Sequence, residues 1–283
     1  MGDFLRSRRA RIGPGDVGLP TYGGRRRVPG LRREELAHLA GVSVDYYVRL
    51  EQGRTGTVSD EVLEALARVL RLDDDERSYL FSLAKPARRA RPSRRTVSPH
   101  LRFLLDAMET TPAYVIDHRT DVLAWNPLVV KLILDFGAVP PERRNWVRLA
   151  FEDPRSERIF PDWTGKASET VAHLRMQAAL HPDDEGLAGL VAELSRTSER
   201  FRGMWEDHNV RERSRGAIRI RNDVVGEVSL HFQTLKVAGE ADQWLVAYAA
   251  EPGSEDDKAL RALAAWSPGD DGPAPDDGGA GSV

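Results

Sequence analysis

The sequence has no cysteine among its 283 residues, which excludes disulfide bonds, thiolate metal sites and cysteine nucleophiles. It also has no apolar run of 18 residues, so it predicts no membrane-spanning helix and no membrane partner. A cluster of arginines stands near the N-terminus, where a signal peptide would carry an apolar stretch. We therefore expect a soluble protein of the cytoplasm.

Catalytic and metal-binding patterns are also scarce. The seven histidines are scattered and form neither a His-x3-His nor an HExxH motif. His181-Pro182-Asp183-Asp184 is better explained by a helix stop followed by an acidic N-cap than by a metal site. The pair Asp207-His208 has no positioned nucleophile, and the glycines at 13–24 do not follow a strand as a phosphate loop would. We expect no enzyme activity, no metal and no cofactor.

Formal charge is distributed unevenly along the chain. Residues 1–95 hold 20 Lys and Arg against 13 Asp and Glu, whereas residues 96–283 hold 21 against 31. A basic first third joined to an acidic remainder fits one part that meets a polyanion and another part that does not. Nearly all the cations are arginines, which a GC-rich genome also favours, so the asymmetry carries this argument and the arginine count does not.

Composition divides the chain into five segments. The first shows helical periodicity, broken by a Gly- and Pro-rich loop at 13–30. A stretch with three prolines and five arginines, and almost nothing to bury, reads as a linker. The last residues are rich in Gly, Pro and Asp. The predicted segments are a helical domain at 1–84, a linker at 85–99, a mixed domain of helices and strands at 100–253, a helix at 254–266 and a disordered tail at 267–283.

The stretch LRREELAHLAGVSVDYYVRLEQGR, residues 31–54, has the pattern of two short helices joined by a tight turn. Gly41 stands where such a turn needs a residue that tolerates positive φ, and Ser43 is placed to cap the second helix. Helices at 3–11, 59–70 and 74–84 complete a five-helix bundle. Two helices crossing at a steep angle need apolar residues on both sides of the turn. The predicted inward residues are Leu36, Ala37, Ala40, Val42, Tyr47 and Leu50.

The same register directs a different set of side chains outward. Two valines and a tyrosine on a surface helix suit contact with base edges and thymine methyl groups in a major groove. Helix termini approach phosphates in this docking mode, and Arg32, Arg33 and Arg54 lie at such termini. A helical hairpin that binds a protein, or nothing, is the alternative. The predicted outward residues are Val44, Asp45, Tyr46, Val48 and Arg49.

The segment LAGVSVDYYVRLEQGR resembles the Cro/phage-repressor-type (XRE) helix-turn-helix, a lambda-repressor-like all-α bundle, over about residues 3–84. The resemblance implies binding to double-stranded operator DNA as a homodimer, and a place at the nucleoid. Asp45 stands where the phage proteins often carry an amide; it can accept from cytosine N4 or orient Arg49. The resemblance implies base contacts by Val44, Asp45 and Arg49, base or backbone contacts by Ser43 and Tyr46, and phosphate contacts by Arg33 and Arg54.

The loop at 13–30 contains Arg25-Arg26-Arg27, which either lies along DNA or is a solvated basic loop. This insertion, in a segment of the form PGLRREELAxLAGVSVDYYxRLEQGR, resembles the actinobacterial regulators named after MmyB. That family carries a ligand-binding C-terminal domain of PAS-like fold. The resemblance extends to about residue 253, through TPAYVIDHRTDVLAWNPL, RFRGMWEDHNVRER, NDVVGEVSLHFQTL and DQWLVAYAAEPGS. Asn222-Asp223 replaces the His-Pro pair common in related sequences.

Residue patterns independently predict an α+β domain with five antiparallel strands. Alternation at 225–235 places Val228, Leu230 and Phe232 on one buried face. Asn126 followed by Pro127 is a capping pair that starts a helix. The predicted strands are 113–117, 121–125, 217–221, 225–235 and 243–250, and the predicted helices are a leading one near 101–108, then 126–134, 141–151, 166–180, 185–207 and 255–265.

A PAS-like domain holds small molecules between its sheet and its helices, and the family association points to a small apolar ligand such as a fatty-acyl compound. We expect seven apolar residues near such a cavity. The alternative is that they only form the hydrophobic core, which is the commoner role of apolar residues at this spacing. A protein-interaction or dimerisation module without a ligand is the competing interpretation of the domain. The expected ligand-binding residues are Tyr114, Trp125, Leu128, Leu132, Trp146, Trp205 and Phe232.

Overall fold

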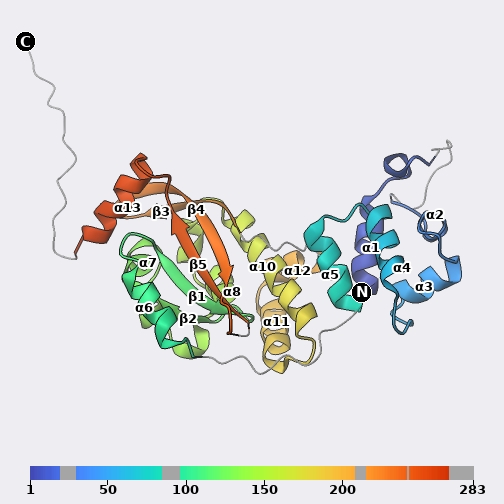
Figure 1. Ribbon diagram of the computed structural model, residues 1–283, viewed down its shortest axis with the longest axis horizontal. Coiled ribbons are helices and arrows are strands. Elements are labelled where there is room, and N and C mark those ends of the chain that lie inside the picture. The colour runs from blue at the N-terminus through green and yellow to red at the C-terminus, as the bar shows by residue number, and fades with distance from the viewer. Residues whose placement is uncertain (20–29, 85–95, 208–214, 241, 268–283) are drawn as a thin grey trace, which may run out of the picture.

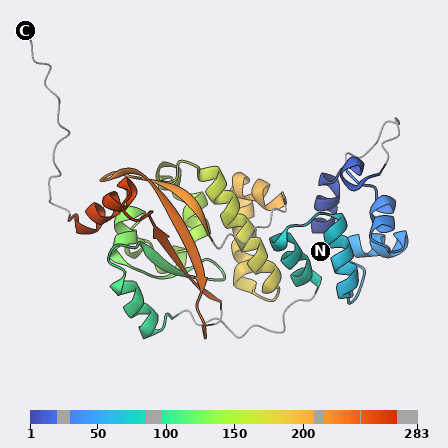
Figure 2. The same ribbon diagram turned by 45° about the horizontal axis from the view of Figure 1, so that its top comes forward.

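Helices build one end of the molecule and a helix-covered sheet builds the other (Figure 1). The computed structural model describes residues 1–19, 30–84, 96–207, 215–240 and 242–267. The Arg25-Arg26-Arg27 loop, His208, most of the expected linker and nearly all of the expected tail therefore lie outside the described residues. The helices α10 to α12 stand between the sheet and the N-terminal helices in both views (Figures 1 and 2).

The five-helix N-terminal bundle is confirmed, with boundaries close to those expected. Serine side chains start two of its helices, because Ser43 accepts a hydrogen bond from the Tyr46 N–H and Ser59 accepts one from the Val62 N–H. Acidic residues occupy the first turns of α4 and α5, where they complement the helix dipole. The elements are α1 (Gly2–Arg11), η1 (Pro14–Val17), α2 (Arg33–Leu39), α3 (Val44–Glu51), α4 (Asp60–Val69) and α5 (Asp74–Ala84).

The turn between α2 and α3 has the expected geometry. Gly41 adopts φ +70°, a left-handed conformation that a side chain would strain. The Val42 N–H donates to the Ala37 carbonyl across the turn, and Val42 packs against the bundle core. Leu36, Tyr47 and Leu50 have no exposed surface, so the two helices meet over a dry interface.

The sheet contains five antiparallel strands in the order β2-β1-β5-β4-β3, as expected for a PAS-like domain. Side chains alternate between its faces: Val115 packs under α6, while Tyr114 and Ile116 point to the opposite side. The strands are β1 (Ala113–Asp117), β2 (Val122–Trp125), β3 (Arg215–Asn222), β4 (Gly226–Lys236) and β5 (Gln243–Ala249).

One face of the sheet carries α6, and the other carries the longer helical segment between β2 and β3. Asn126 joins these layers: its amide donates to the carbonyls of Met108 and Thr111, and its oxygen accepts from the N–H groups of Ala113 and Val129. The helices of this part are α6 (Pro99–Ala107), α7 (Pro127–Leu132), η2 (Phe136–Ala138), η3 (Pro141–Arg143), α8 (Trp146–Glu152), α9 (Arg155–Ile159), α10 (Trp163–Leu180), α11 (Glu185–Thr197), α12 (Glu199–Glu206) and α13 (Glu255–Ala265).

Two helix expectations were wrong in detail. The single helix expected at 185–207 is divided by Ser198, whose extended backbone (φ −126°, ψ 112°) ends α11 and whose hydroxyl caps α12. The helix expected at 141–151 begins only at Trp146, because the Asn145 side chain caps it by accepting from two backbone N–H groups. The short α9 was not expected at all.

The N-terminal bundle packs against α10 of the second part. Met176 and Ala179 are buried in the same apolar cluster as the side chains of α1 to α5, and Leu180 packs against it. The Arg11 guanidinium donates to the Asp207 carbonyl at 3.1 Å across the same boundary. Helix α10 therefore belongs to the cores of both parts.

Candidate DNA-reading helix and ligand cavity

Helix α3 presents a small exposed face with little internal bonding. Val44 is 46% exposed, and Asp45 and Arg49 are exposed beside it. Tyr46 and Val48, which were expected to face outward, are half-buried instead. Within the described part of the chain, the side chains of Asp45 and Arg49 form neither an ion pair with each other nor any other hydrogen bond. Arg49 is thus available to an external acceptor.

A buried carboxylate ties the end of α3 to its neighbours. Glu51 has no exposed side-chain surface, and its oxygens accept from Arg9 Nη2 at 2.7 Å and from Arg33 Nε at 2.5 Å. Arg6 lies 3.7 Å away. Burial alone would raise the pKa of Glu51, but the bonds from Arg9 and Arg33 outweigh burial and hold the pKa below its usual value.

The expected phosphate-contact residues differ in how they are held. Arg33 is anchored by Glu51 but keeps 45% of its side-chain surface exposed. Arg32 is exposed, with a guanidinium nitrogen 3.6 Å from Glu34, and Arg54 is exposed just past α3. Ser43 is exposed and serves as the cap of α3. All three arginines lie near the termini of α2 and α3, as the docking mode requires.

A cavity of about 240 Å³, here called the central cavity, lies between the sheet and α10. Strands β1, β4 and β5 supply one wall, Trp146 of α8 closes one side, and α10 supplies the other wall. Its rings and aliphatic side chains give it an apolar floor, while charged and hydroxyl groups gather on the helix. The lining residues are Tyr114, Ile116, Thr120, Trp146, Lys166, Glu169, Thr170, His173, Phe232, Thr234, Lys236, Trp244 and Val246.

The structure brings Tyr114, Trp146 and Phe232 together around the central cavity, and it places the other four expected ligand-binding residues elsewhere. Trp125, Leu128 and Leu132 pack in the apolar core beside the sheet without lining the cavity. Trp205 lies in a separate cluster, where the Arg175 guanidinium stacks 4.6 Å from its ring. Trp205 therefore packs beside the buried Arg175, away from the central cavity.

The wall formed by α10 is polar. The Lys166 ammonium lies 5.4 Å from the Trp146 ring and 5.8 Å from the Phe232 ring, in the range of cation–π contact. Burial lowers the pKa of Lys166 to about 8, against the raising effect of Glu169. Burial also lowers the pKa of His173 to about 4, and the neighbouring Lys166 charge adds to that shift, so His173 is neutral at pH 7.

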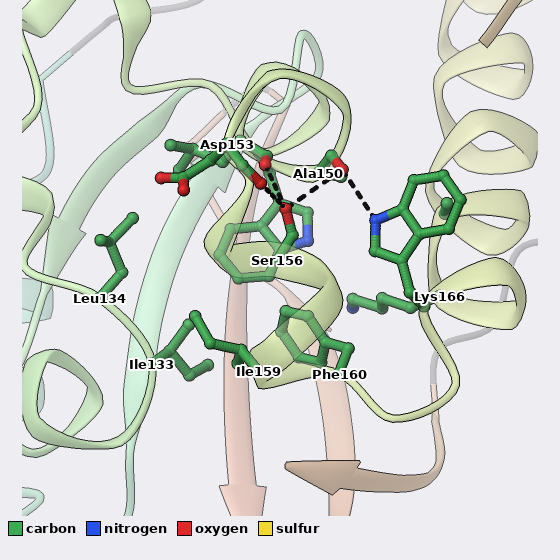
Figure 3. A pocket seen from close by; sticks show the side chains of 12 residues that line it. Ile133, Leu134, Ala150, Asp153, Ser156, Ile159, Phe160 and Lys166 are labelled. Atoms are coloured by element: carbon green, nitrogen blue, oxygen red, sulfur yellow. Dashed lines mark hydrogen bonds between the residues drawn. The ribbon is translucent and has the colours of Figure 1, made fainter. Parts of the chain in front are cut away.

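A second, smaller hollow of about 20 Å³ adjoins the first and shares Trp146 and Lys166 with it. Figure 3 shows Lys166 reaching from α10 toward Phe160, with the apolar side chains of Ile133, Leu134 and Ile159 on the far side of the hollow. Hydrogen bonds hold the wall of this smaller hollow, because Ser156 Oγ donates to backbone carbonyls of α8 and the neighbouring loop. Lys166 is thus the charged group at the junction of the two hollows.

The sequence analysis did not identify the α10 residues of the cavity, although a signal was present. Lys166, Thr170, His173 and Gln177 recur at intervals of four, three and four, which places them on one face of a helix. Polar residues at that spacing normally mark a solvent-facing side, and only the packing of α10 on the sheet reveals otherwise.

No group of three His, Cys, Asp or Glu side chains among the described residues could hold a metal ion. Within the same residues, no helix is both long enough and apolar enough to cross a membrane. Asp184 serves as the N-cap of α11, as expected for the His181–Asp184 segment, and also bonds His118 Nε2 at 2.5 Å.

Comparison with known families assigns both parts of the chain. Residues 97–263, more than half of the chain, match the model of the MmyB-like transcription regulator ligand binding domain. The chain belongs to this family. Residues 1–80 match the model of a helix-turn-helix domain, so the MmyB-like chain is a DNA-binding transcription regulator. A search of curated proteins finds no match.

Proposed function

We propose that this MmyB-like regulator binds a two-fold-related operator as a homodimer and that its C-terminal domain senses a small, largely apolar ligand, with a fatty-acyl compound as the first candidate. The observation that carries the proposal is the central cavity inside the matched ligand-binding domain, bordered by the helix on which the DNA-binding bundle packs. A cavity walled mainly by aromatic and aliphatic groups suits an apolar ligand body.

The reading face of α3 supports sequence-specific binding. Val44, Asp45 and Arg49 are exposed side by side, and an arginine that has no partner among the described residues can bond guanine O6 and N7. Arg32, Arg33 and Arg54 lie where phosphates approach, with Ser43 and Tyr46 beside them. We propose base contacts for the first group and mainly backbone contacts for the second.

The dimer proposal rests on an exposed apolar surface of α6. Phe103 is 68% exposed and Leu104 is 47% exposed, and they are neighbours on a helix whose other side is buried against the sheet. A second copy covering these two side chains would place two reading helices in one particle, as a two-fold operator requires. If the domain is purely a dimerisation module, it uses the same surface of α6, but its cavity has no ligand.

The test is a gel-shift titration of the full chain on fragments of its own promoter region at low salt. Arg49→Ala should lose about 1–3 kcal/mol of discrimination between operator and unrelated DNA, while Arg54→Ala should weaken all fragments about equally. Native mass spectrometry of the purified protein should show a retained apolar compound. A chain that shifts no fragment, or whose cavity never retains or accepts an apolar compound, contradicts the corresponding half of the proposal.

A further inference from the structure

Helix α10 turns a stripe of polar side chains toward the sheet. Lys166, Thr170 and His173 line the central cavity, and Gln177 follows one turn later on the same helix face. His181, at the C-cap of the helix, continues the stripe, and its ring centroid lies 4.3 Å from that of His118 with the two rings tilted by 38°. A helix face packed on a sheet is ordinarily apolar, so this polar stripe needs a separate explanation.

Hydrogen-bonding capacity along the stripe is unmet. His173 Nε2 is buried and has no partner among the described residues, and the same holds for both amide atoms of Gln177, which is 1% exposed. The Lys166 side chain is half-buried, and its ammonium contacts the rings of Trp146 and Phe232 but has no hydrogen bond or ion pair with any residue that the structure describes. Buried polar groups without partners are costly and are usually bonded by a ligand or by water.

The charges that face the central cavity do not balance. Its ionisable lining consists of Lys166, Glu169 and the neutral His173 on α10, Lys236 on β4, and Tyr114, whose pKa burial raises well above 10. Two ammonium groups therefore face one carboxylate. The chain has only five lysines among its 41 basic residues, and two of the five lie here. Lys236 is exposed at the rim, so the positive charge within the cavity is that of Lys166, and the cavity is partly open to solvent.

We propose that the central cavity binds a small organic anion, whose acidic group lies at the Lys166 ammonium within hydrogen-bonding reach of the polar stripe and whose apolar body lies on Tyr114, Trp146 and Phe232. An anion at this point gives Lys166 the partner that it lacks and balances its charge. This inference rests on the ligand-sensing half of the proposed function and specifies the charge of the ligand. The affinity for a ligand then depends on its acidic group and not only on the size of its apolar body.

The experiment uses two fluorescent probes of similar shape and different charge on the full chain. 8-Anilinonaphthalene-1-sulfonate carries an acidic group, and N-phenyl-1-naphthylamine is its neutral counterpart. We expect the sulfonate to bind the wild-type chain at least about tenfold more tightly than the neutral probe, the gain of one well-placed charge pair. Lys166→Met should reduce this preference to nearly one, whereas Lys166→Arg, which keeps the charge, should retain most of it.

Lys258→Met is the matched control, since Lys258 is exposed on α13 and does not line the cavity. It should leave both affinities unchanged. Equal binding of the two probes, no binding of the sulfonate, or a sulfonate affinity that survives Lys166→Met would overturn the inference. Binding of the neutral probe alone would overturn the anion while leaving an apolar sensor intact. A failed gel shift with an intact sulfonate preference would instead overturn the DNA-binding half of the proposed function and leave this inference standing.

Discussion

Glu51 is the residue on which the DNA-binding bundle depends most clearly for its charge balance. It is fully buried and joins Arg9 of α1 and Arg33 of α2 to the end of the reading helix. Glu51→Gln leaves the side-chain shape but removes the charge that the two guanidinium groups share. We expect a loss of about 2–4 kcal/mol in the free energy of unfolding, measured by urea titration.

Glu64→Gln is the control for that loss, because Glu64 pairs with Arg77 on the surface and its substitution should not move the unfolding midpoint.

The pH dependence of the stability adds a second readout for Glu51. The folded pKa of Glu51 lies below its unfolded value, so its contribution is complete above about pH 4.5 and is lost as pH falls through the folded pKa. The difference between wild type and Glu51→Gln should therefore shrink in acid. A constant difference would contradict this role.

Lys166 makes the folding stability depend on pH in the alkaline range, where Glu51 does not titrate. Its folded pKa is lowered to about 8 from 10.5, so between these values the unfolded chain binds more protons than the folded chain. Stability must then rise with pH across that window. We expect wild type to gain stability relative to Lys166→Met between pH 8 and pH 10.5 in urea titrations, and to show no such gain below pH 7. A difference independent of pH would mean that the ammonium is fully solvated.

At the level of elements, α10 contributes to two sites through different sets of side chains. One face lines the central cavity, while Met176 and Ala179 lie in the core of the DNA-binding bundle. The pKa of Arg175, which is buried at this boundary, is lowered to about 10 by desolvation. An occupant that shifts α10 relative to the sheet would therefore change the surface on which the bundle rests.

Ala179→Glu tests this docking, because it buries a charge between α10 and the bundle. The expected result is an increased radius of gyration in small-angle X-ray scattering, with the helical circular dichroism preserved, since a desolvated carboxylate costs several kcal/mol. Ala188→Glu, at an exposed position of α11, should leave the radius unchanged. An Ala179→Glu chain as compact as wild type would show that the bundle is held in another way.

Elements with local signals were the ones that sequence reasoning placed well. Helical periodicity predicted α4 and α5 nearly to the residue, the expected helix at 255–265 coincides with α13, and alternation predicted β4. The break at Ser198 was missed because it has neither glycine nor proline. Three aromatic residues of the cavity were among the seven expected from the PAS-like resemblance, but its α10 wall was not expected. Whether a polar helix face meets water or a cavity is decided by tertiary packing.

At the scale of the whole molecule, the reading helix and the exposed side chains of α6 belong to different ends of an elongated chain (Figure 1). A single reading helix contacts only one half-site, and two half-sites on one face of DNA lie about 34–36 Å apart or a multiple of this. The proposed contact through α6 would therefore join two ligand-binding parts and leave the DNA-binding bundles free to span the operator.

Phe103→Glu combined with Leu104→Glu tests that arrangement. Both side chains are exposed, so the double variant should fold like wild type, yet four carboxylates would meet at the proposed interface. We expect light scattering to give a dimer mass for wild type and a monomer mass for the variant. Operator affinity should fall by at least about tenfold, with a shallower salt dependence because fewer phosphates are contacted. Val224→Glu, which places a charge on an exposed apolar residue of the β3–β4 turn, is the control and should remain dimeric. A double variant that keeps the dimer mass would remove α6 as the interface.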